Sequence, residues 1–280
     1  RDNDMKIDDS LRHTFDKNGY VVIKNFFTHD ETDEIRNGVL QSFNKRRTNG
    51  GVYGTEKNAK GENFYGIPEL LSISELEKFN FIVLHPKIIQ LSQLLINRPV
   101  CYFGDSTAQI GTGTRGFHKD NVDRSDSTGP DWQSNYDVLR IGIYTQDTHS
   151  HSGGMQLRLR SHLSANRFYG TPKNIRLKKG DILAWKLTMT HSGNTLLPRI
   201  YPNFSYLLPR LTSKLPDYFF KPYASERVAL FMTFGGLNSI HTTNYIRYLE
   251  SRSDTLSFKP TESCLETAKI RNISLLPLKK

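Results

Sequence analysis

A histidine and an aspartate stand two residues apart in the segment Gly116-Phe-His-Lys-Asp120. Side chains two positions apart on a regular strand point to the same face, so His118 and Asp120 would converge. An imidazole and a carboxylate from one β scaffold supply two ligands of a 2-His-1-carboxylate site, whose open positions suit non-haem Fe(II). Because His-x-Asp pairs also occur by chance, this pair alone leaves the metal site a hypothesis.

A third ligand would have to be a histidine from a distant strand. Of the nine histidines, His191 is the best placed, because it follows a strong strand and precedes the small-residue turn Ser-Gly-Asn. Apart from His118, the other histidines lie in predicted helices or polar turns. At the end of a strand, His191 would face the open end of a barrel. The alternative is that it is a histidine in a surface turn.

Short strands separated by polar turns are predicted from residue 99 onward, which is typical of a sandwich or barrel. The predicted strands are Val100–Ile110, Val138–Gln146, Met155–Arg160, Asp181–Leu187 and Val228–Phe234.

The N-terminal part reads as helices around one strand. A strand is predicted over Tyr20–Phe27, and Thr28-His-Asp-Glu31 is a capping box that starts a helix. Residues 45–66 read as an exposed loop, and helices are predicted around 68–80, 86–97 and 241–252. We expect a single domain over 1–280, with helical decoration in 1–98, a core in 99–234 and a helix and tail in 235–280.

Four blocks of the sequence, in a fixed order, carry a resemblance to a known family. They are Gly19–Phe27 with the following Thr28–Ile35, Phe117-His-Lys-Asp120, Gly153–His162, and Lys179–Asn194. With the last predicted strand they span about residues 19–234. Their order and spacing resemble the phytanoyl-CoA dioxygenase family of Fe(II)- and 2-oxoglutarate-dependent oxygenases.

The resemblance implies a mainly β fold with flanking helices and a double-stranded β-helix (jelly-roll, cupin-like) core. It implies iron held by His118, Asp120 and His191, with 2-oxoglutarate as cosubstrate and O₂ as oxidant. The reaction would hydroxylate an unactivated C–H bond of a small, anionic or natural-product-like metabolite and release succinate and CO₂. Related halogenases lack the carboxylate ligand, so Asp120 favours hydroxylation.

The family also carries an arginine that pairs with the distal carboxylate of 2-oxoglutarate, a bidentate geometry that lysine reproduces poorly. The family places it about ten residues after the distal histidine. Arg199 lies closer to that position, but a poor strand follows it. Arg227 directly precedes the predicted strand Val228–Phe234. We favour Arg227, keep Arg199 as the alternative, and treat residues 197–225 as an insertion.

Four further residues are candidates for the same pocket. Thr107 and Gln109 lie two apart on a predicted strand, so they share a face and could reach the cosubstrate. Arg140 is a charged residue within an apolar strand. If its side chain points into the core, it would bind an anionic group; the alternative is that it points to solvent. Trp185, on the Asp181–Leu187 strand, is assigned with Arg140 to the substrate.

The net charge of +10 is unevenly distributed, since residues 1–150 sum to −3 and residues 151–280 to +13. We interpret the excess as a setting for an anionic small molecule, and it disfavours nucleic acid as the partner. Three alternatives stay open. They are a 2-oxoglutarate oxygenase acting on nucleic acid or protein, a non-catalytic β-sandwich binding module, and a zinc or other metal hydrolase.

The cellular location is inferred from the amino-acid composition alone. No run approaches the roughly 18 apolar residues that a membrane span needs. Cys101 and Cys264 are too few for a disulfide scaffold. We therefore expect a cytoplasmic protein without a membrane span, and the sequence contains no indication of its oligomeric state.

Overall fold

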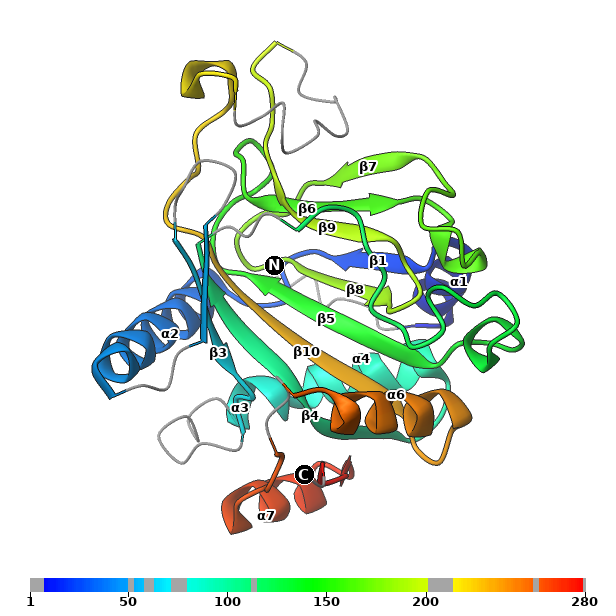
Figure 1. Ribbon diagram of the computed structural model, residues 1–280. Coiled ribbons are helices and arrows are strands. Elements are labelled where there is room, and N and C mark those ends of the chain that lie inside the picture. Colours follow the sequence, from blue (N-terminus) through cyan, green and yellow to red (C-terminus); the bar gives the residue numbers. More distant parts are fainter. Residues whose placement is uncertain are drawn as a thin grey trace.

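Two sheets, antiparallel except for one short strand, face each other in the computed structural model (Figure 1). The structure describes residues 8–49, 53–57, 63–71, 80–111, 115–200, 214–253 and 257–278. The larger sheet has the strand order β1-β8-β5-β10-β4-β3-β2, and the smaller has the order β7-β6-β9. This arrangement is the predicted jelly roll in a mainly β fold.

The strand predicted over Tyr20–Phe27 is present as β1 but ends at Ile23. The large sheet contains β1 (Tyr20–Ile23), β8 (Ile182–Lys186), β5 (Val138–Tyr144), β10 (Val228–Gly236), β4 (Val100–Ile110), β3 (Asn63–Pro68), β2 (Tyr53–Lys57) and the short β11 (Ser274–Leu275), which pairs parallel to β4. The small sheet contains β7 (Pro172–Ile175), β6 (Gly154–Arg158) and β9 (His191–Thr195). All five strands predicted after residue 99 are confirmed.

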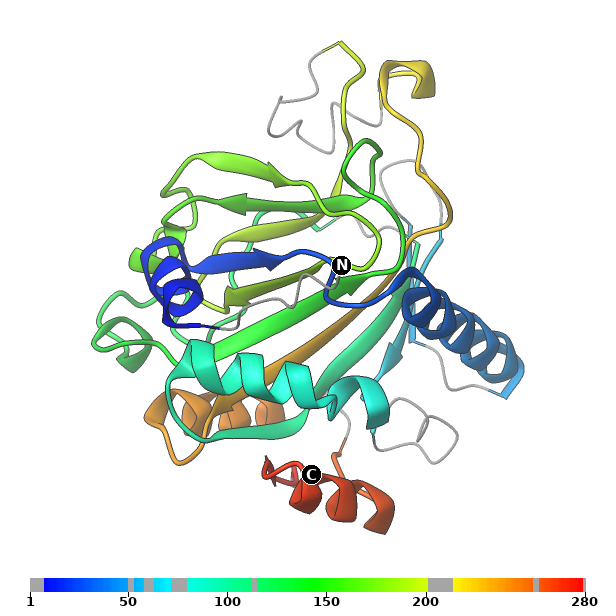
Figure 2. The ribbon, with the colours of Figure 1, turned by 180° about the vertical axis from the view of Figure 1, so that it is seen from behind.

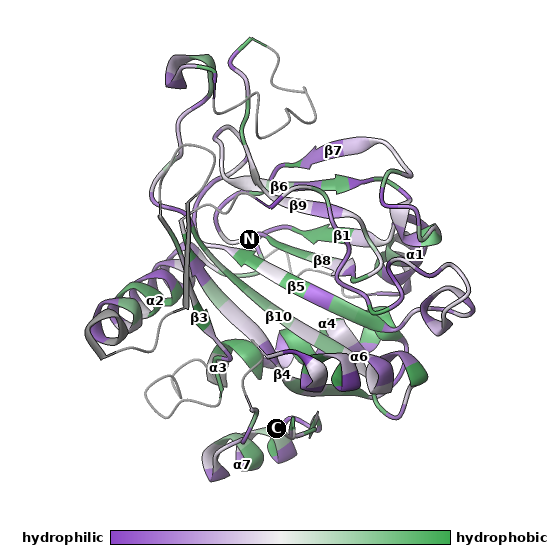
Figure 3. Cartoon of the chain, in the orientation of Figure 1, coloured by the Kyte–Doolittle hydropathy of each residue, from purple (hydrophilic) through white to green (hydrophobic). Residues whose placement is uncertain are grey.

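Alternate residues of the large sheet serve different layers. On β10, Leu230, Met232 and Phe234 belong to the core beneath the helices, whereas Ala229 and Phe231 belong to a second core between the sheets. Figure 3 shows hydrophobic strands with a hydrophilic position interrupting β5. The inner face therefore holds polar groups within an otherwise apolar sheet.

α4 lies across the outer face of the large sheet (Figure 2), whereas α6 lies on the opposite side of that sheet (Figure 1). The helices are α1 (Asp9–Asn18), α2 (His29–Asn49), α3 (Asn80–Val83), α4 (Pro86–Ile96), α6 (Ile240–Ser251) and α7 (Glu262–Ile270). The predicted capping box starts α2, because the Glu31 amide donates to Thr28 Oγ1 (3.2 Å) and the Thr28 amide to Glu31 Oε2 (2.7 Å). None of the described helices is long and apolar enough to cross a bilayer.

One prediction for the N-terminal part was wrong, and another lies mostly outside the described residues. The expected loop at 45–66 contains the end of α2 and strands β2 and β3, because β3 extends the sheet by pairing with β4. Of the helix expected around 68–80, residues 72–79 lie outside the described chain; β3 ends at Pro68, and the short helix α3 begins at Asn80. Residues 201–213 of the expected insertion also lie outside it.

Candidate metal centre

His118 and His191 are backbone partners. The His118 amide donates to the His191 carbonyl (3.0 Å), and the His191 amide donates to the His118 carbonyl (2.9 Å). Directly paired residues of antiparallel segments carry their side chains on the same face. The two imidazole centroids accordingly lie 4.3 Å apart. One pair of hydrogen bonds thus joins ligand candidates that are far apart in the sequence.

Asp120 completes the group. Its amide donates to the Leu187 carbonyl (3.3 Å), and its carboxylate oxygens lie 3.5 Å from His118 Nε2 and 3.3 Å from His191 Nε2. One donor atom from each of the three residues lies within 4.8 Å of the others, which no other His, Cys, Asp or Glu group in the described chain achieves. The structure therefore brings together all three predicted ligands.

Lys119, between two of these residues, points the opposite way and anchors the segment. Its Nζ donates to the carbonyls of Ser161 (2.7 Å) and Thr188 (2.6 Å), and it lies 5.2 Å from the centre of the Trp132 ring. Burial lowers the pKa of Lys119 to about 7. The segment makes only an isolated bridge rather than the expected regular strand, so this anchor helps to keep His118 and Asp120 on one face.

Both imidazoles are oriented by backbone carbonyls. His118 Nδ1 lies 2.7 Å from the Gly116 carbonyl, and His191 Nδ1 lies 3.1 Å from the Met189 carbonyl. Since each Nδ1 donates there, each Nε2 keeps its lone pair for a metal. Burial, assisted by the neighbouring His191, lowers the pKa of His118 to about 3. A neutral imidazole is the form that binds metal.

The carboxylate is kept ionised. Burial alone would raise the pKa of Asp120, but the charge of Arg140 and the two imidazoles outweigh it and hold that pKa well below its ordinary value. Arg140 lies inward on β5, and its Nη1 donates to Asp120 Oδ2 (2.6 Å). The anions that Arg140 meets here are the protein's own carboxylates, rather than the substrate anion expected for it.

One cavity of about 790 Å³ contains this group and most of the other predicted site residues. Its lining includes His118, Asp120, His191, Arg227, Thr107, Gln109, Arg140 and Trp185. Arg199 does not line the cavity; it is exposed and bonds the carbonyls of Phe219 and Phe220. The geometry thus favours Arg227 of the two candidate arginines.

Arg227 is a buried cation (4 % exposed) that pairs with no carboxylate in the part of the chain that the structure describes. Its Nε and Nη1 donate to the carbonyls of Gly153 and Gly111 (both 3.1 Å). Its Nη2 lies 3.9 Å from the position a Cβ would take at Gly193, beside His191. A buried guanidinium without an acidic partner is costly, so the site suits an anionic ligand.

A second buried donor supports this fit. The Trp185 side chain is 1 % exposed, lines the cavity and packs against His191 with ring centres 5.6 Å apart. Its Nε1 has no hydrogen-bond partner among the described residues. Buried donors normally have an acceptor, so this one also suits a bound ligand. Two histidines, a carboxylate and these donors fit Fe(II) with a dicarboxylate cosubstrate.

Sequence reasoning missed several residues of the cavity. Asp105 lies on β4 and lines the cavity with Thr107 and Gln109. Extending their two-residue periodicity by one step would have found it. Tyr245, Tyr248 and Arg252, from α6 and its end, carry no motif, and only the folded chain brings them to the cavity.

The jelly roll and a His-Asp-His group beside a buried arginine define the class of non-haem iron oxygenases with a facial metal site. Comparison of sequences narrows this class, because the profile of the family described as phytanoyl-CoA dioxygenase (PhyH) matches residues 15–195. The chain belongs to this family. It is accordingly an iron- and 2-oxoglutarate-dependent enzyme of the oxygenase type that uses O₂. No curated protein sequence matches it.

Several solved structures share the fold at low identity. SnoN, a non-heme alpha ketoglutarate dependent epimerase from nogalamycin biosynthesis, has 13% identity and a TM-score of 0.58, covering 90% of this chain and 92% of its own. SnoK, a carbocyclase from the same biosynthesis, has 16% identity, a TM-score of 0.58 and coverages of 91% and 95%. HygX from Streptomyces hygroscopicus, solved with nickel, 2-oxoglutarate and hygromycin B bound, has 13% identity, a TM-score of 0.53 and coverages of 83% and 88%.

Proposed function

We propose that His118, Asp120 and His191 hold Fe(II), and that the enzyme hydroxylates an unactivated C–H bond of a small anionic metabolite. The observation that carries the proposal is the backbone pairing of His118 with His191, which sets three donor atoms within 4.8 Å beside a buried arginine. Bound iron, with 2-oxoglutarate and O₂, supplies the oxidation and yields succinate and CO₂.

The cosubstrate would lie between the metal group and Arg227. The guanidinium pairs with the distal carboxylate, for which its fork geometry is suited. Thr107 and Gln109 share the cavity-facing side of β4 and add polar contacts. The Trp185 indole N–H donates to an acceptor on the bound ligands. Phe231 and Met155 line the same space and exclude water from it.

The substrate would enter past a basic rim. Arg124 and Arg252 line the cavity and lie over the Tyr248 ring, with guanidinium carbons 5.2 Å and 5.5 Å from its centre. Arg115 lines it as well; 67% of its side chain is exposed, and its Nη1 lies 3.9 Å from Asp120 Oδ1. Three guanidinium groups that line one cavity attract an anion such as a phosphate or carboxylate. This rim supports an anionic substrate.

The outcome at the substrate carbon is the finer part of the proposal. Asp120 occupies the place that a halide would need, which supports hydroxylation. Because similar structures include an epimerase and a carbocyclase, product analysis must look for an added oxygen atom and for unchanged composition.

The test is an anaerobic titration of the protein with Fe(II) and 2-oxoglutarate. We expect a weak visible charge-transfer band that His191→Ala abolishes and that the exposed-residue control His149→Ala retains. A folded protein without the band, or a band that persists in His191→Ala, contradicts the proposed site.

Substrate class is tested by succinate release across paired anionic and neutral metabolites. We expect stimulation by anionic compounds, with a raised KM in Arg124→Gln. Stimulation by neutral compounds alone contradicts the anionic assignment, and tight, salt-sensitive binding of nucleic acid would favour the nucleic-acid alternative.

A further inference from the structure

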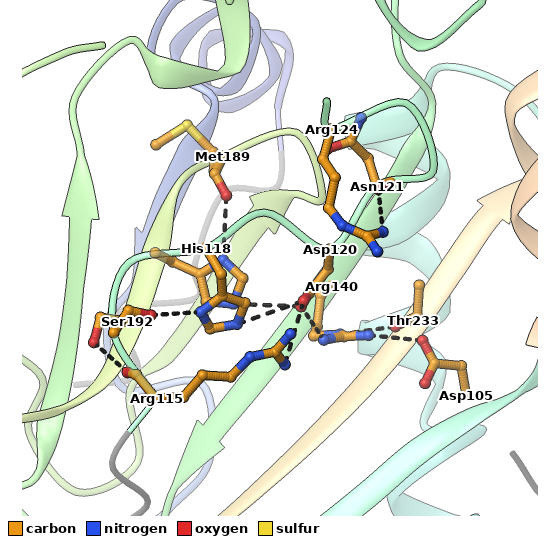
Figure 4. A network of polar contacts seen from close by, with 12 residues as sticks. Asp105, Arg115, His118, Asp120, Asn121, Arg124, Arg140, Met189, Ser192 and Thr233 are labelled. Carbon is orange, nitrogen blue, oxygen red and sulfur yellow. Dashed lines mark hydrogen bonds and ion pairs between the residues drawn. The ribbon is translucent and has the colours of Figure 1, made fainter. Parts of the chain in front are cut away.

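Arg140 is a charged group of the cavity to which the proposed reaction assigns no contact with cosubstrate or substrate. All three nitrogens of its guanidinium are bonded: Nη1 to Asp120 Oδ2 (2.6 Å), Nη2 to Asp105 Oδ2 (2.7 Å) and Nε to Thr233 Oγ1 (2.9 Å). Figure 4 shows Arg140 between Asp120 on one side and Asp105 and Thr233 on the other. Only 17% of its side chain is exposed, so these bonds are largely shielded from water.

Asp105 reaches Arg140 from an irregular part of β4. Met232 of β10 lies opposite Ser106 and Phe234 lies opposite Tyr102, so residues 103–105 face the single residue Thr233. Such bulges redirect side chains and are common beside active sites. Gly104 within the bulge has φ of +82°, and a Cβ there would overlap Phe258, so glycine is required.

A tyrosine on α6 hydrogen-bonds to the Asp105 carboxylate. The Tyr245 hydroxyl, on α6, donates to Asp105 Oδ2 (2.8 Å) and accepts from Arg140 Nη2 (3.2 Å). Tyr245 is itself buried. A continuous series of bonds therefore runs from α6 through Asp105 and Arg140 to Asp120.

We propose that Arg140 is a positioning residue that fixes which oxygen of Asp120 faces the metal. This inference rests on the proposed metal ligands. Oδ2 accepts the short bond from Arg140 (2.6 Å) and lies 3.3 Å from His191 Nε2. Oδ1 has only the longer contacts to His118 Nε2 (3.5 Å) and Arg115 Nη1 (3.9 Å), so we assign Oδ1 as the ligand oxygen. A carboxylate held at one oxygen ligates through the other, which keeps the neighbouring metal positions open. Lysine cannot replace a guanidinium that bonds three groups at once.

The test uses Co(II) in place of iron, without cosubstrate, and measures its dissociation constant and visible ligand-field bands in the full-length protein. We expect Arg140→Met to weaken Co(II) binding by about tenfold or more and to shift the bands, because outer-shell partners of metal ligands have effects of this size. Arg140→Lys should shift the bands too. Asp105→Asn and Tyr245→Phe should shift them less.

Arg98→Met is the matched control. It breaks another arginine–aspartate pair, Arg98 to Asp137 at 2.7 Å, which does not line the cavity. We expect wild-type Co(II) affinity and bands in this variant.

Unchanged affinity and bands in folded Arg140→Met overturn the inference. Should that variant not fold, unchanged bands in both Asp105→Asn and Tyr245→Phe overturn it instead. His191→Ala separates the two proposals: if it still binds Co(II) as the wild type does, the proposed metal site is wrong, whatever Arg140 does.

Discussion

The two faces of the large sheet are built from alternate residues of the same strands but contain different chemistry. On the outer face, Leu230 and Met232 of β10 pack beneath the helices with no exposed surface. On the inner face, Phe231 of the same strand borders the cavity, and Thr233 Oγ1 accepts a hydrogen bond from Arg140 Nε (2.9 Å). A single strand thus contributes every second residue to stability and the others to the site.

The difference shows how a jelly roll tolerates a polar cavity. Buried arginine, aspartate and histidine on the inner face contribute little net stability, because desolvation offsets their attraction. The apolar outer face supplies that stability instead. Substitutions on the two faces should therefore separate stability from ligand binding.

The largest expected effect is a loss of stability on the outer face. We expect Leu230→Ala to lower the free energy of unfolding by about 2–5 kcal/mol, because it opens a cavity under the helices. The KM for 2-oxoglutarate should stay unchanged in the folded variant. Urea denaturation and succinate release measure the two quantities.

Phe231→Leu on the inner face is the control, and we expect it to raise that KM with a smaller loss of stability. Equal effects of the two substitutions on KM would show that the faces are not separable.

The second effect is on the inner face. We expect Arg227→Lys to raise the KM for 2-oxoglutarate about 10- to 100-fold, because lysine keeps the charge but loses the bidentate geometry. Co(II) affinity should not change. Steady-state succinate release measures the KM. Arg199→Lys, at the exposed alternative, should be silent; a larger effect there than at Arg227 would reverse the assignment.

The sequence predicted the site residues of the inner face best where they lie close together along the chain. His118 and Asp120 formed a motif, and strand alternation put Thr107 and Gln109 on one face. His191 was singled out by the strand before it and the turn after it, but only the resemblance assigned it as a ligand, because such a histidine can equally lie in a surface turn. Asp105 was missed because the two-residue periodicity of Thr107 and Gln109 was not extended by one step, and Tyr245 because α6 carries no chemical signature. The strands β2 and β3 were missed because their polar composition resembles a loop.

The third effect is a pH dependence of the free energy of unfolding, and it arises where His162 contacts α1. His162 Nε2 donates to the Asp16 carbonyl at the end of α1 (3.2 Å), and burial lowers the pKa of His162 to about 4. Between pH 6.5 and 4, His162 is protonated in the unfolded chain but stays neutral in the folded chain. Stability should therefore fall from pH 6.5 to 4, by at most about 1.4 kcal/mol per pH unit from this group.

His162→Gln isolates this contribution, because His118 and His85 also have lowered pKa values and remain in the variant. We expect urea denaturation at pH 7.5 and pH 5 to show a smaller loss in His162→Gln than in the wild type. An equal loss would assign the pH dependence to the other groups.

The smallest effect tests whether the outer helices influence the inner face. We expect Thr28→Ala to cost about 1 kcal/mol, because it removes the cap of α2. Arg36 of the same helix donates to the Glu226 carbonyl (2.7 Å), directly before Arg227. Loss of the cap frays only the first turn, and Arg36 lies beyond it, so the KM for 2-oxoglutarate should not change. Thr261→Ala, which removes the equivalent cap of α7, should cost a similar amount. A KM that rises in Thr28→Ala but not in Thr261→Ala would show that α2 holds Arg227 in place, and the two faces would then be coupled through Arg36.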